Sequence, residues 1–357
     1  MGRARSTTRS RSQARAGHLD RLASAAPRSR RPETGARPLR VLITGASGFA
    51  GGHLAQACTA AGDEVLGASR SGALPAGAGD GLAIDLRDGP GVRRLMRDLR
   101  PEVVYHLAAL SSVGRSWEDP VGTVKDNVAT AVSVLDALAR EAPHARAVWV
   151  SSCEVYGAPT HLPIEENAPI GPSNPYAVSK AAGDLLAGVY AQAHGLHVIR
   201  VRPFSHAGPR QLPIFVVSSL ARQAATTLLG GAERVEIVTG NPDTRRDFTD
   251  VRDIVRAYRR LAAVAAPGVY NVSSGRSISA ADQVALLASL IAPVRVEHVV
   301  DPARVRAHEV MDLRGCSARL RSATGWEPEI PFRQTMLDTI EWWKRELGGP
   351  QPGPEAG

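Results

Sequence analysis

Short apolar runs alternate with longer amphipathic stretches from residue 39 to about residue 201. The apolar runs predict strands at 39–44, 64–68, 82–85, 103–107, 147–151 and 197–201. Between them we expect one helix that opens after residue 44 and ends near 61, and others near 91–99, 121–140 and 176–194. Apolar strands that alternate with helices are typical of a parallel sheet covered on both faces. The pattern therefore predicts a doubly wound α/β domain of the Rossmann type.

The alternation weakens after residue 203. Helices are expected near 214–229, 251–265, 280–291 and 333–346, with strands at 235–238 and 269–272. We assign 39–204 to a nucleotide-binding domain to which 247–273 returns, and 205–246 with 274–346 to a smaller C-terminal α/β substrate lobe. The loop at 71–81 is rich in Gly and Ala and is expected to be mobile.

The charge of the chain is concentrated at its start. The 357 residues carry a net charge of +8, which by itself favours a nucleic-acid partner. Residues 1–39 hold ten Arg against Asp20 and Glu33, so this segment carries the whole excess and the remainder is neutral. We therefore expect no nucleic-acid partner for the folded part. The leader at 1–38 and the Pro- and Gly-rich tail at 347–357 are predicted to be disordered. For the leader three interpretations remain: a dispensable extension, a transit peptide and a weak polyanion-binding arm.

The cysteines and the apolar runs indicate the compartment in which the protein is expected. No apolar run approaches the roughly 18 to 20 residues needed to cross a bilayer, so no membrane insertion is expected. Cys58, Cys153 and Cys316 are far apart and have no metal-ligand spacing, which predicts neither disulfides nor a metal site. A reducing cytoplasm is the expected compartment.

A glycine-rich turn follows the first predicted strand. Gly45, Gly48 and Gly51 lie where absent side chains let the backbone approach a pyrophosphate at a helix N-terminus, although a purely structural turn is the alternative. The second predicted strand ends at Ser69 and Arg70 instead of the acidic residue that usually binds a ribose 2′-OH. Because a guanidinium suits a 2′-phosphate, we expect NADP(H) to be preferred and NAD(H) to be possible, with an ordinary surface arginine as the alternative.

Further cofactor contacts are expected after the later strands. Asp85 and Leu86 are placed to meet the adenine, and Ala108 and Ala109 are small enough to let the cofactor lie against the sheet. The expected cofactor-binding residues are Gly45, Ser47, Gly48, Phe49, Ala50, Gly51, Ser69, Arg70, Asp85, Leu86, Leu107, Ala108, Ala109, Tyr176 and Lys180.

Tyr176 and Lys180 are separated by one turn of a predicted helix and share a face. A phenol with a reference pKa near 10 must drop by roughly three units to exchange protons at neutral pH, and a neighbouring ammonium and a nicotinamide ring would supply that stabilisation. The Tyr-x-x-x-Lys pattern alone is also typical of a solvated helix face. Together with the glycine turn it predicts hydride chemistry at an alcohol or ketone carbon.

Five motifs in this order resemble the extended short-chain dehydrogenase/reductase superfamily, in its nucleotide-sugar branch, over about residues 39–346. They are Thr44-Gly-Ala-Ser-Gly-Phe-Ala-Gly51, His106-Leu-Ala-Ala109, Ser151-Ser-Cys-Glu-Val-Tyr-Gly157, Tyr176-x-x-x-Lys180 and Arg246-Asp-Phe-Thr-Asp-Val-Arg-Asp253. The resemblance implies that Ser152 binds the substrate oxygen, that Tyr176 is the acid/base, and that Lys180 tunes it and holds the nicotinamide ribose. It also implies a homodimer. A hydroxyl that only satisfies backbone groups is the alternative for Ser152.

The resemblance also implies the substrate contacts. Glu154 matches a Glu that takes a proton from the sugar ring in nucleotide-sugar 4,6-dehydratases, but some 4-keto sugar reductases keep a Glu there too. Ser111 begins a segment similar to the substrate loop of GDP-mannose dehydratases and GDP-6-deoxy-4-ketohexose reductases. Arg246 and Arg306 match arginines that clamp the sugar-nucleotide diphosphate, with surface ion pairs as the alternative. The stretch Arg306-Ala-His-Glu309 departs from the usual Arg-Pro-x-Glu/Asp.

Two stretches, at 204–211 and 246–258, resemble GDP-6-deoxy-4-keto-D-mannose reductases, and a longer insertion of the GDP-mannose 4,6-dehydratases is missing. The resemblance thus implies reduction of the C4 ketone of a GDP-4-keto-6-deoxy-hexose, with hydride from NADPH, a proton from Tyr176 and the oxygen held by Ser152. A GDP-mannose 4,6-dehydratase, a nucleotide-sugar 4-epimerase and a non-catalytic nucleotide-binding regulator are the alternatives. The expected partner is a nucleotide-diphosphate sugar, with a GDP-sugar favoured.

Overall fold

The structure is a computed structural model that describes residues 37–305 and 309–348. The chain divides into two units, Met1–Arg37 and Pro38–Gly357, and the second holds the elements described here. The expected disorder of the leader and of most of the tail falls outside the described residues, and so does Arg306.

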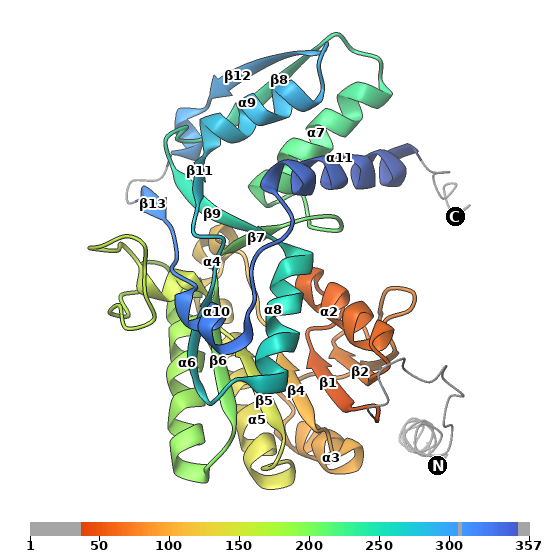
Figure 1. Cartoon of the computed structure of the whole chain (residues 1–357), viewed down its shortest axis with the longest axis vertical. Helices are drawn as coiled ribbons and strands as arrows, with labels where there is room; N and C mark the ends of the chain where they lie inside the picture. Colours follow the sequence, from red (N-terminus) through yellow and green to blue (C-terminus); the bar gives the residue numbers. More distant parts are fainter. Residues whose placement is uncertain (1–36, 306–308, 349–357) are drawn as a thin grey trace, which may run out of the picture. The chain divides into compact units, whose positions relative to one another are not determined.

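A seven-stranded parallel sheet forms the centre of the fold, as the pattern predicts (Figure 1). The strands run in the order β10 (Gly268–Val272), β6 (Val198–Pro203), β5 (Arg146–Val150), β4 (Val103–His106), β1 (Arg40–Thr44), β2 (Glu64–Ser69) and β3 (Asp80–Ala83). The chain moves outward from β1 to β3 and then crosses back to β4, so the order reverses between β1 and β4. Ligands of doubly wound sheets bind at such a reversal, beyond the carboxyl ends of the strands.

Helices cover both faces of this sheet. Helices α2 (Phe49–Ala60) and α8 (Val251–Val264) pack together on one face. The other face carries α3 (Gly89–Leu99), α5 (Pro120–Glu141) and α6 (Pro175–His194). Val41 and Ile43 lie in the core cluster that includes α2 and α8, whereas Leu42 lies in the cluster on the opposite face. Side chains that alternate along a strand and are buried on both faces explain why β1 is a continuous apolar run.

The smaller part has its own apolar core. Strands β8 (Arg234–Thr239) and β12 (Arg295–Val300) pair in parallel. Helices α7 (Val216–Leu229), α9 (Ala280–Leu290) and α11 (Phe332–Gly348) enclose a core cluster that includes Leu220, Ile237, Val284 and Met336. Helix α11 extends through Gly348, two residues beyond the expected end and into the segment expected to be disordered. No helix in the described ranges is long and apolar enough to cross a membrane.

Several short elements were not expected from the sequence. Strand β9 (Arg245–Asp250) pairs with β7 (Ser205–Ala207), β11 (Ser277–Ser279) and β13 (Asp312–Leu313). Helices α4 (Val113–Glu118) and α10 (Ala318–Thr324) were also missed, and β3 begins two residues earlier than expected, inside the predicted loop at 71–81. The short strands among them lack an apolar period of their own and are held by pairing with neighbours distant in the sequence.

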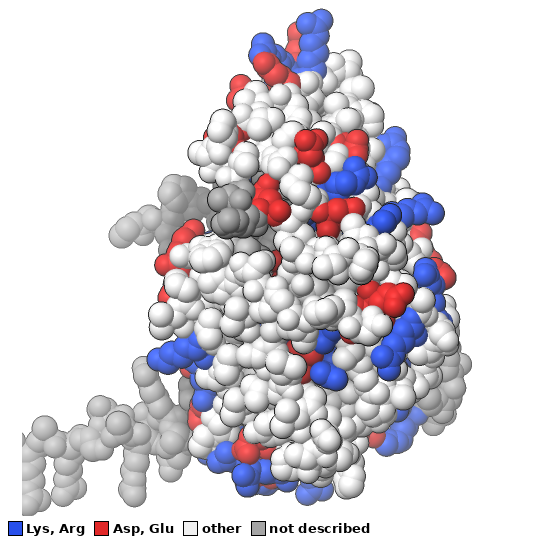
Figure 2. Space-filling view, turned by 90° about the vertical axis from the view of Figure 1, so that its left-hand side faces the viewer, with Lys and Arg blue, Asp and Glu red and all other residues white. Residues whose placement is uncertain are grey.

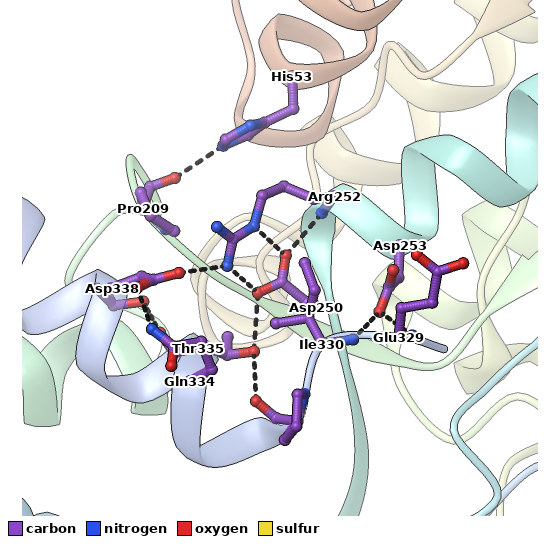
Figure 3. A network of polar contacts seen from close by, with 12 residues as sticks. His53, Pro209, Asp250, Arg252, Asp253, Glu329, Ile330, Gln334, Thr335 and Asp338 are labelled. Atoms are coloured by element: carbon purple, nitrogen blue, oxygen red, sulfur yellow. Dashed lines mark hydrogen bonds and ion pairs between the residues drawn. The ribbon is translucent and has the colours of Figure 1, made fainter. Parts of the chain in front are cut away.

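A network of polar contacts joins α8 to α11 (Figure 3). Asp250 caps α8 by accepting the N–H of Arg252 at 2.8 Å, and its carboxylate also accepts two hydrogen bonds from the Arg252 guanidinium and one from the Thr335 hydroxyl, each at 2.8 Å. The same guanidinium donates to Asp338 on α11 at 2.6 Å. Asp253 accepts the backbone N–H groups of residues 329 and 330, which fastens the segment before α11 to α8.

Candidate active site

A cavity of about 1050 Å³ opens where the parallel strands end. Its lining includes the segments that follow β1, β3, β4, β5 and β6, together with parts of the smaller lobe. All of the expected site residues that the structure describes line it: Gly45, Ser47, Gly48, Phe49, Ala50, Gly51, Ser69, Arg70, Asp85, Leu86, Leu107, Ala108, Ala109, Ser111, Ser152, Glu154, Tyr176, Lys180 and Arg246. Arg306 lies outside the described residues.

The turn after β1 fits a dinucleotide. Gly45 has φ +74°, and a Cβ there would lie 2.8 Å from the backbone of Ala108, so only glycine fits. Gly48 is the N-cap of α2, and no side chain accepts a hydrogen bond from the first turn of this helix. The N–H groups of that turn and the positive end of the helix dipole therefore face the cavity, which suits a pyrophosphate.

Two arginines, Arg70 after β2 and Arg87 after β3, line the cavity and differ in their contacts. Arg87 binds the carboxylate of Asp85 with its Nε at 3.0 Å and its Nη2 at 2.8 Å. These hydrogen bonds, and the more distant charge of Arg70, lower the pKa of Asp85 to about 2. Arg70 itself makes no hydrogen bond or ion pair within the described part of the chain. Its guanidinium is thus available to a phosphate, whereas that of Arg87 is engaged.

Ser152 and Tyr176 line the cavity from different elements. Ser152 follows β5, and Tyr176 lies in the first turn of α6. Both side chains are buried, and their hydroxyls are close enough to share a hydrogen bond. The structure therefore brings together the two hydroxyls that the resemblance assigned to the substrate oxygen.

The pKa of Tyr176 is shifted by its surroundings. Burial raises it above the ordinary value, the hydrogen bond with Ser152 lowers it only in part, and the charge of Glu154 raises it further. The ammonium of Lys180 donates to the carbonyl oxygen of Val150 at 2.5 Å, and burial lowers the pKa of Lys180 to about 8. Among the protein groups alone, burial outweighs the hydrogen bond that lowers the Tyr176 pKa, and the lowering expected beside a nicotinamide ring stays a prediction.

Glu154 is tied to the start of α6. It lies in the 3₁₀ turn η1 (Cys153–Tyr156), and Ser152 Oγ accepts its backbone N–H at 3.2 Å. Asn174 donates from Nδ2 to Glu154 Oε2 at 3.1 Å and accepts the N–H of Ala177 at its Oδ1 at 2.8 Å. The sequence reasoning missed Asn174, although an Asn directly before Pro is a typical helix start.

Asn127 was also missed. It lies on α5, lines the cavity, and binds both backbone groups of Leu110 at 2.7 and 3.1 Å. Its Nδ2 also donates to Ser179 Oγ at 2.8 Å, between Tyr176 and Lys180. No sequence signal distinguishes this Asn on a long helix, because its partners come from two other segments.

Ser111 and Arg246, which the resemblance assigned to the substrate, differ in how they are held. Ser111 is exposed and directly precedes Ser112, which caps α4. Arg246, on β9, donates from Nη1 to the backbone oxygens of Arg245 and Val310 at 2.8 and 2.9 Å. Its guanidinium is thus fixed by the backbone at the cavity wall. Within the described ranges no group of three or more His, Cys, Asp or Glu is placed to hold a metal ion.

Comparison with known proteins places this site in context. The family model of the GDP-mannose 4,6 dehydratases matches residues 42–339. The GDP-6-deoxy-D-mannose reductase of Pseudomonas aeruginosa is 38% identical over 312 residues, which are 86% of this chain and 98% of that protein. The dTDP-glucose 4,6-dehydratase of Streptomyces griseus is 31% identical, over 89% of this chain and 98% of that protein. The solved structure of RMD from Pseudomonas aeruginosa complexed with NADPH has a TM-score of 0.75 and 35% identity, and the match covers 86% of this chain and 99% of that one.

Proposed function

Since the chain belongs to the GDP-mannose 4,6-dehydratase family of extended short-chain dehydrogenases/reductases, we propose that it reduces the C4 ketone of a GDP-4-keto-6-deoxy-hexose with NADPH. The observation that carries this choice is the 38% identity to a GDP-6-deoxy-D-mannose reductase, of which the match covers 98%. The position of Ser152 and Tyr176 in the cavity lining supports it, because the oxygen of a reduced ketone must receive a proton from a nearby hydroxyl.

The reaction divides between a hydride and a proton. A reduced nicotinamide supplies the hydride when it is bound at the glycine turn. Ser152 donates a hydrogen bond to the C4 oxygen of the sugar, and Tyr176 gives that oxygen its proton, so that the ketone becomes an alcohol. Lys180, which is buried beside the same helix turn, places a positive charge near the phenolate that remains. Arg246, and the undescribed Arg306, are proposed to bind the diphosphate, and Ser111 the sugar.

The parts of the fold are proposed to share this work. Residues 39–204 together with 247–273 bind the cofactor, and residues 205–246 together with 274–346 bind the nucleotide sugar. Support comes from the position of the cavity, whose lining includes both the turn after β1 and residues of β8 and β9. The unpaired thiols of Cys58, Cys153 and Cys316 support the reducing cytoplasm as the location.

A dehydratase acting on GDP-mannose is the second candidate. Glu154 supports it, because a carboxylate that faces the cavity beside Tyr176 is what removal of a ring proton requires. The two reactions differ in cofactor use, since a dehydratase recycles its nicotinamide and a reductase consumes one per turnover.

The test measures the loss of NADPH absorbance with GDP-4-keto-6-deoxymannose, beside a parallel reaction with GDP-mannose. We expect stoichiometric NADPH consumption with the keto sugar alone. Tyr176→Phe is expected to lower kcat by about a hundredfold or more, the usual contribution of a general acid, with the NADPH dissociation constant unchanged. A 4-keto product formed from GDP-mannose, without NADPH consumption, would instead establish the dehydratase.

We propose that NADPH is preferred over NADH because Arg70 lines the cavity at the end of β2 and makes no hydrogen bond or ion pair with any of the residues that the structure describes. Arg70→Ala removes a charged fork that suits a 2′-phosphate. We expect NADPH affinity to fall about tenfold and NADH affinity to stay unchanged. Equal loss for both cofactors would place Arg70 outside this contact, and Arg87→Ala serves as the matched control.

The proposed assembly is a homodimer through α5 and α6. Val132, Val178, Leu185 and Val189 on these helices are 40, 44, 52 and 61% exposed. The acidic and basic residues of α6, apart from His194 at its end, are Lys180 and Asp184, and both are buried. Figure 2 faces the side on which α6 lies, and charged side chains are sparse over its lower middle. Light scattering after gel filtration is expected to give twice the mass of the chain, and Leu185→Glu the mass of one chain.

A further inference from the structure

One amide side chain connects the two proton-handling groups of the site. Asn174 Oδ1 accepts the N–H of Ala177 and so caps the helix that carries Tyr176. Its Nδ2 donates to Glu154 Oε2 at 3.1 Å. The side chain is buried, with 8% of its surface exposed, so neither hydrogen bond is readily replaced by solvent.

The two hydrogen bonds leave the amide a single orientation. The backbone N–H of Ala177 is a donor, so it must meet Asn174 Oδ1, and the NH₂ group is then directed at Glu154. Glu154 therefore uses Oε2 as an acceptor toward Asn174. No partner of Glu154 Oε1 is found within the described part of the chain, and the side chain lines the cavity.

We propose that Asn174 is a positioning residue that fixes Glu154 and Tyr176 in one geometry, so that Glu154 Oε1 accepts a hydrogen bond from a sugar hydroxyl beside the carbonyl that Tyr176 protonates. This role rests on the proposed reductase function. Glu154 lies in η1 and Tyr176 in α6, two segments separated by a long connection, and a shift of about 1 Å between them is enough to cost catalysis severely. Because one amide binds both segments, it prevents such a shift of η1 relative to α6.

Exchange of donor and acceptor tests the orientation directly. In Glu154→Gln, the NH₂ group of Asn174 still demands an acceptor, so the new amide must turn its oxygen toward Asn174 and its own NH₂ toward the cavity. In the double variant Asn174→Asp with Glu154→Gln, the aspartate still caps α6 but now accepts from the glutamine. The glutamine oxygen then faces the cavity again, as Glu154 Oε1 does in the natural protein.

Asn174→Ser separates the cap from the contact with Glu154. Serine is also a good N-cap, but it is too short to reach Glu154. We expect thermal stability and NADPH affinity close to those of the natural protein, and kcat/KM for the keto sugar about tenfold lower, the loss of one charge-assisted hydrogen bond. An unchanged kcat/KM in Asn174→Ser would overturn the positioning role.

The decisive comparison is between Glu154→Gln and the double variant, measured by NADPH consumption with GDP-4-keto-6-deoxymannose. We expect the double variant to be about tenfold more active, because it restores an acceptor toward the sugar. If the two variants were equally active, the direction in which the amide of residue 154 points would have no effect, and the proposal would be overturned. That result would indicate that Glu154 acts as a base that removes a proton, which an amide cannot do in either variant. If the natural protein consumes no NADPH, the proposed function fails. The orientation is then judged from the dissociation constant of GDP-mannose, which must weaken in Glu154→Gln and recover in the double variant.

Discussion

The carboxylate of Asp250 joins α8 to α11, and its removal gives a prediction that can be worked out from the structure. It is buried and accepts the cap hydrogen bond of α8, two hydrogen bonds from the Arg252 guanidinium and one from Thr335 (Figure 3). Asp250→Ala deletes all of these. Loss of an N-cap costs about 1 kcal/mol. The buried Thr335 hydroxyl keeps only its long contact of 3.5 Å with the Pro331 oxygen, so loss of the Asp250 acceptor costs roughly 1 to 2 kcal/mol more.

The ion pair with Arg252 adds less. The Arg252 side chain is 40% exposed, so solvent screens the pair, and Arg252 keeps a second partner in Asp338. We therefore assign this pair only about 0.5 kcal/mol, which brings the expected loss to about 3 kcal/mol. Asp338→Asn is the matched control, because it removes the charge of the outer ion pair and keeps an amide oxygen that can accept from Gln334, and it is expected to cost about 0.5 kcal/mol.

Urea unfolding followed by tryptophan fluorescence measures both variants, with the free energy of unfolding obtained by linear extrapolation. Trp326, Trp342 and Trp343 lie in or beside the segments that this network joins. A loss in Asp250→Ala no larger than that in Asp338→Asn would refute the reasoning, since it would mean that the cap and the Thr335 contact contribute nothing. An unchanged m-value is required for the comparison, because a changed slope reports a change in the exposed surface and not in the contact.

The remaining expectations concern single groups near the cavity. Tyr258 is fully buried and its hydroxyl has no partner among the described residues, so Tyr258→Phe should raise the free energy of unfolding by about 1 kcal/mol in urea titrations, and a loss would contradict this. Burial lowers the pKa of Lys180 to about 8 from an ordinary value of 10.5. Between these two pH values the unfolded chain binds the proton more tightly than the folded protein does, so the free energy of unfolding rises with pH. Lys180→Met should flatten that rise in unfolding measurements at several pH values, and an unaltered pH dependence would refute this expectation. Gly45 has φ +74°, and Gly45→Ala would force a Cβ against the backbone of Ala108. A fluorescence titration should show NADPH affinity lowered at least tenfold, whereas normal affinity would mean that the turn adapts to the new side chain.

Local patterns in the sequence identified most of the larger part of the fold. The apolar runs of β1 and β2 and the periodicity of α6 depend on each element being buried along its own length, so their positions were predicted closely. The glycine turn and Tyr176 with Lys180 were predicted for the same reason, because each is a short spacing within one turn or one helix face. Strand β9 was missed, because Arg245–Asp250 has no apolar run and becomes a strand only through its pairing with β7, β11 and β13.

The sequence by itself determined the fold class, the place of the cofactor turn and the set of hydroxyl, amine and carboxylate groups available for chemistry, since these follow from residue type and short spacing. Only the tertiary structure decided how the groups act on one another. Burial raises the pKa of Tyr176 more than the hydrogen bond with Ser152 lowers it. Lys180 donates to the carbonyl oxygen of Val150. Asn174 joins Glu154 to α6 across a long separation in the chain. Desolvation and contacts between distant segments set these properties, and neither exists before the chain has folded.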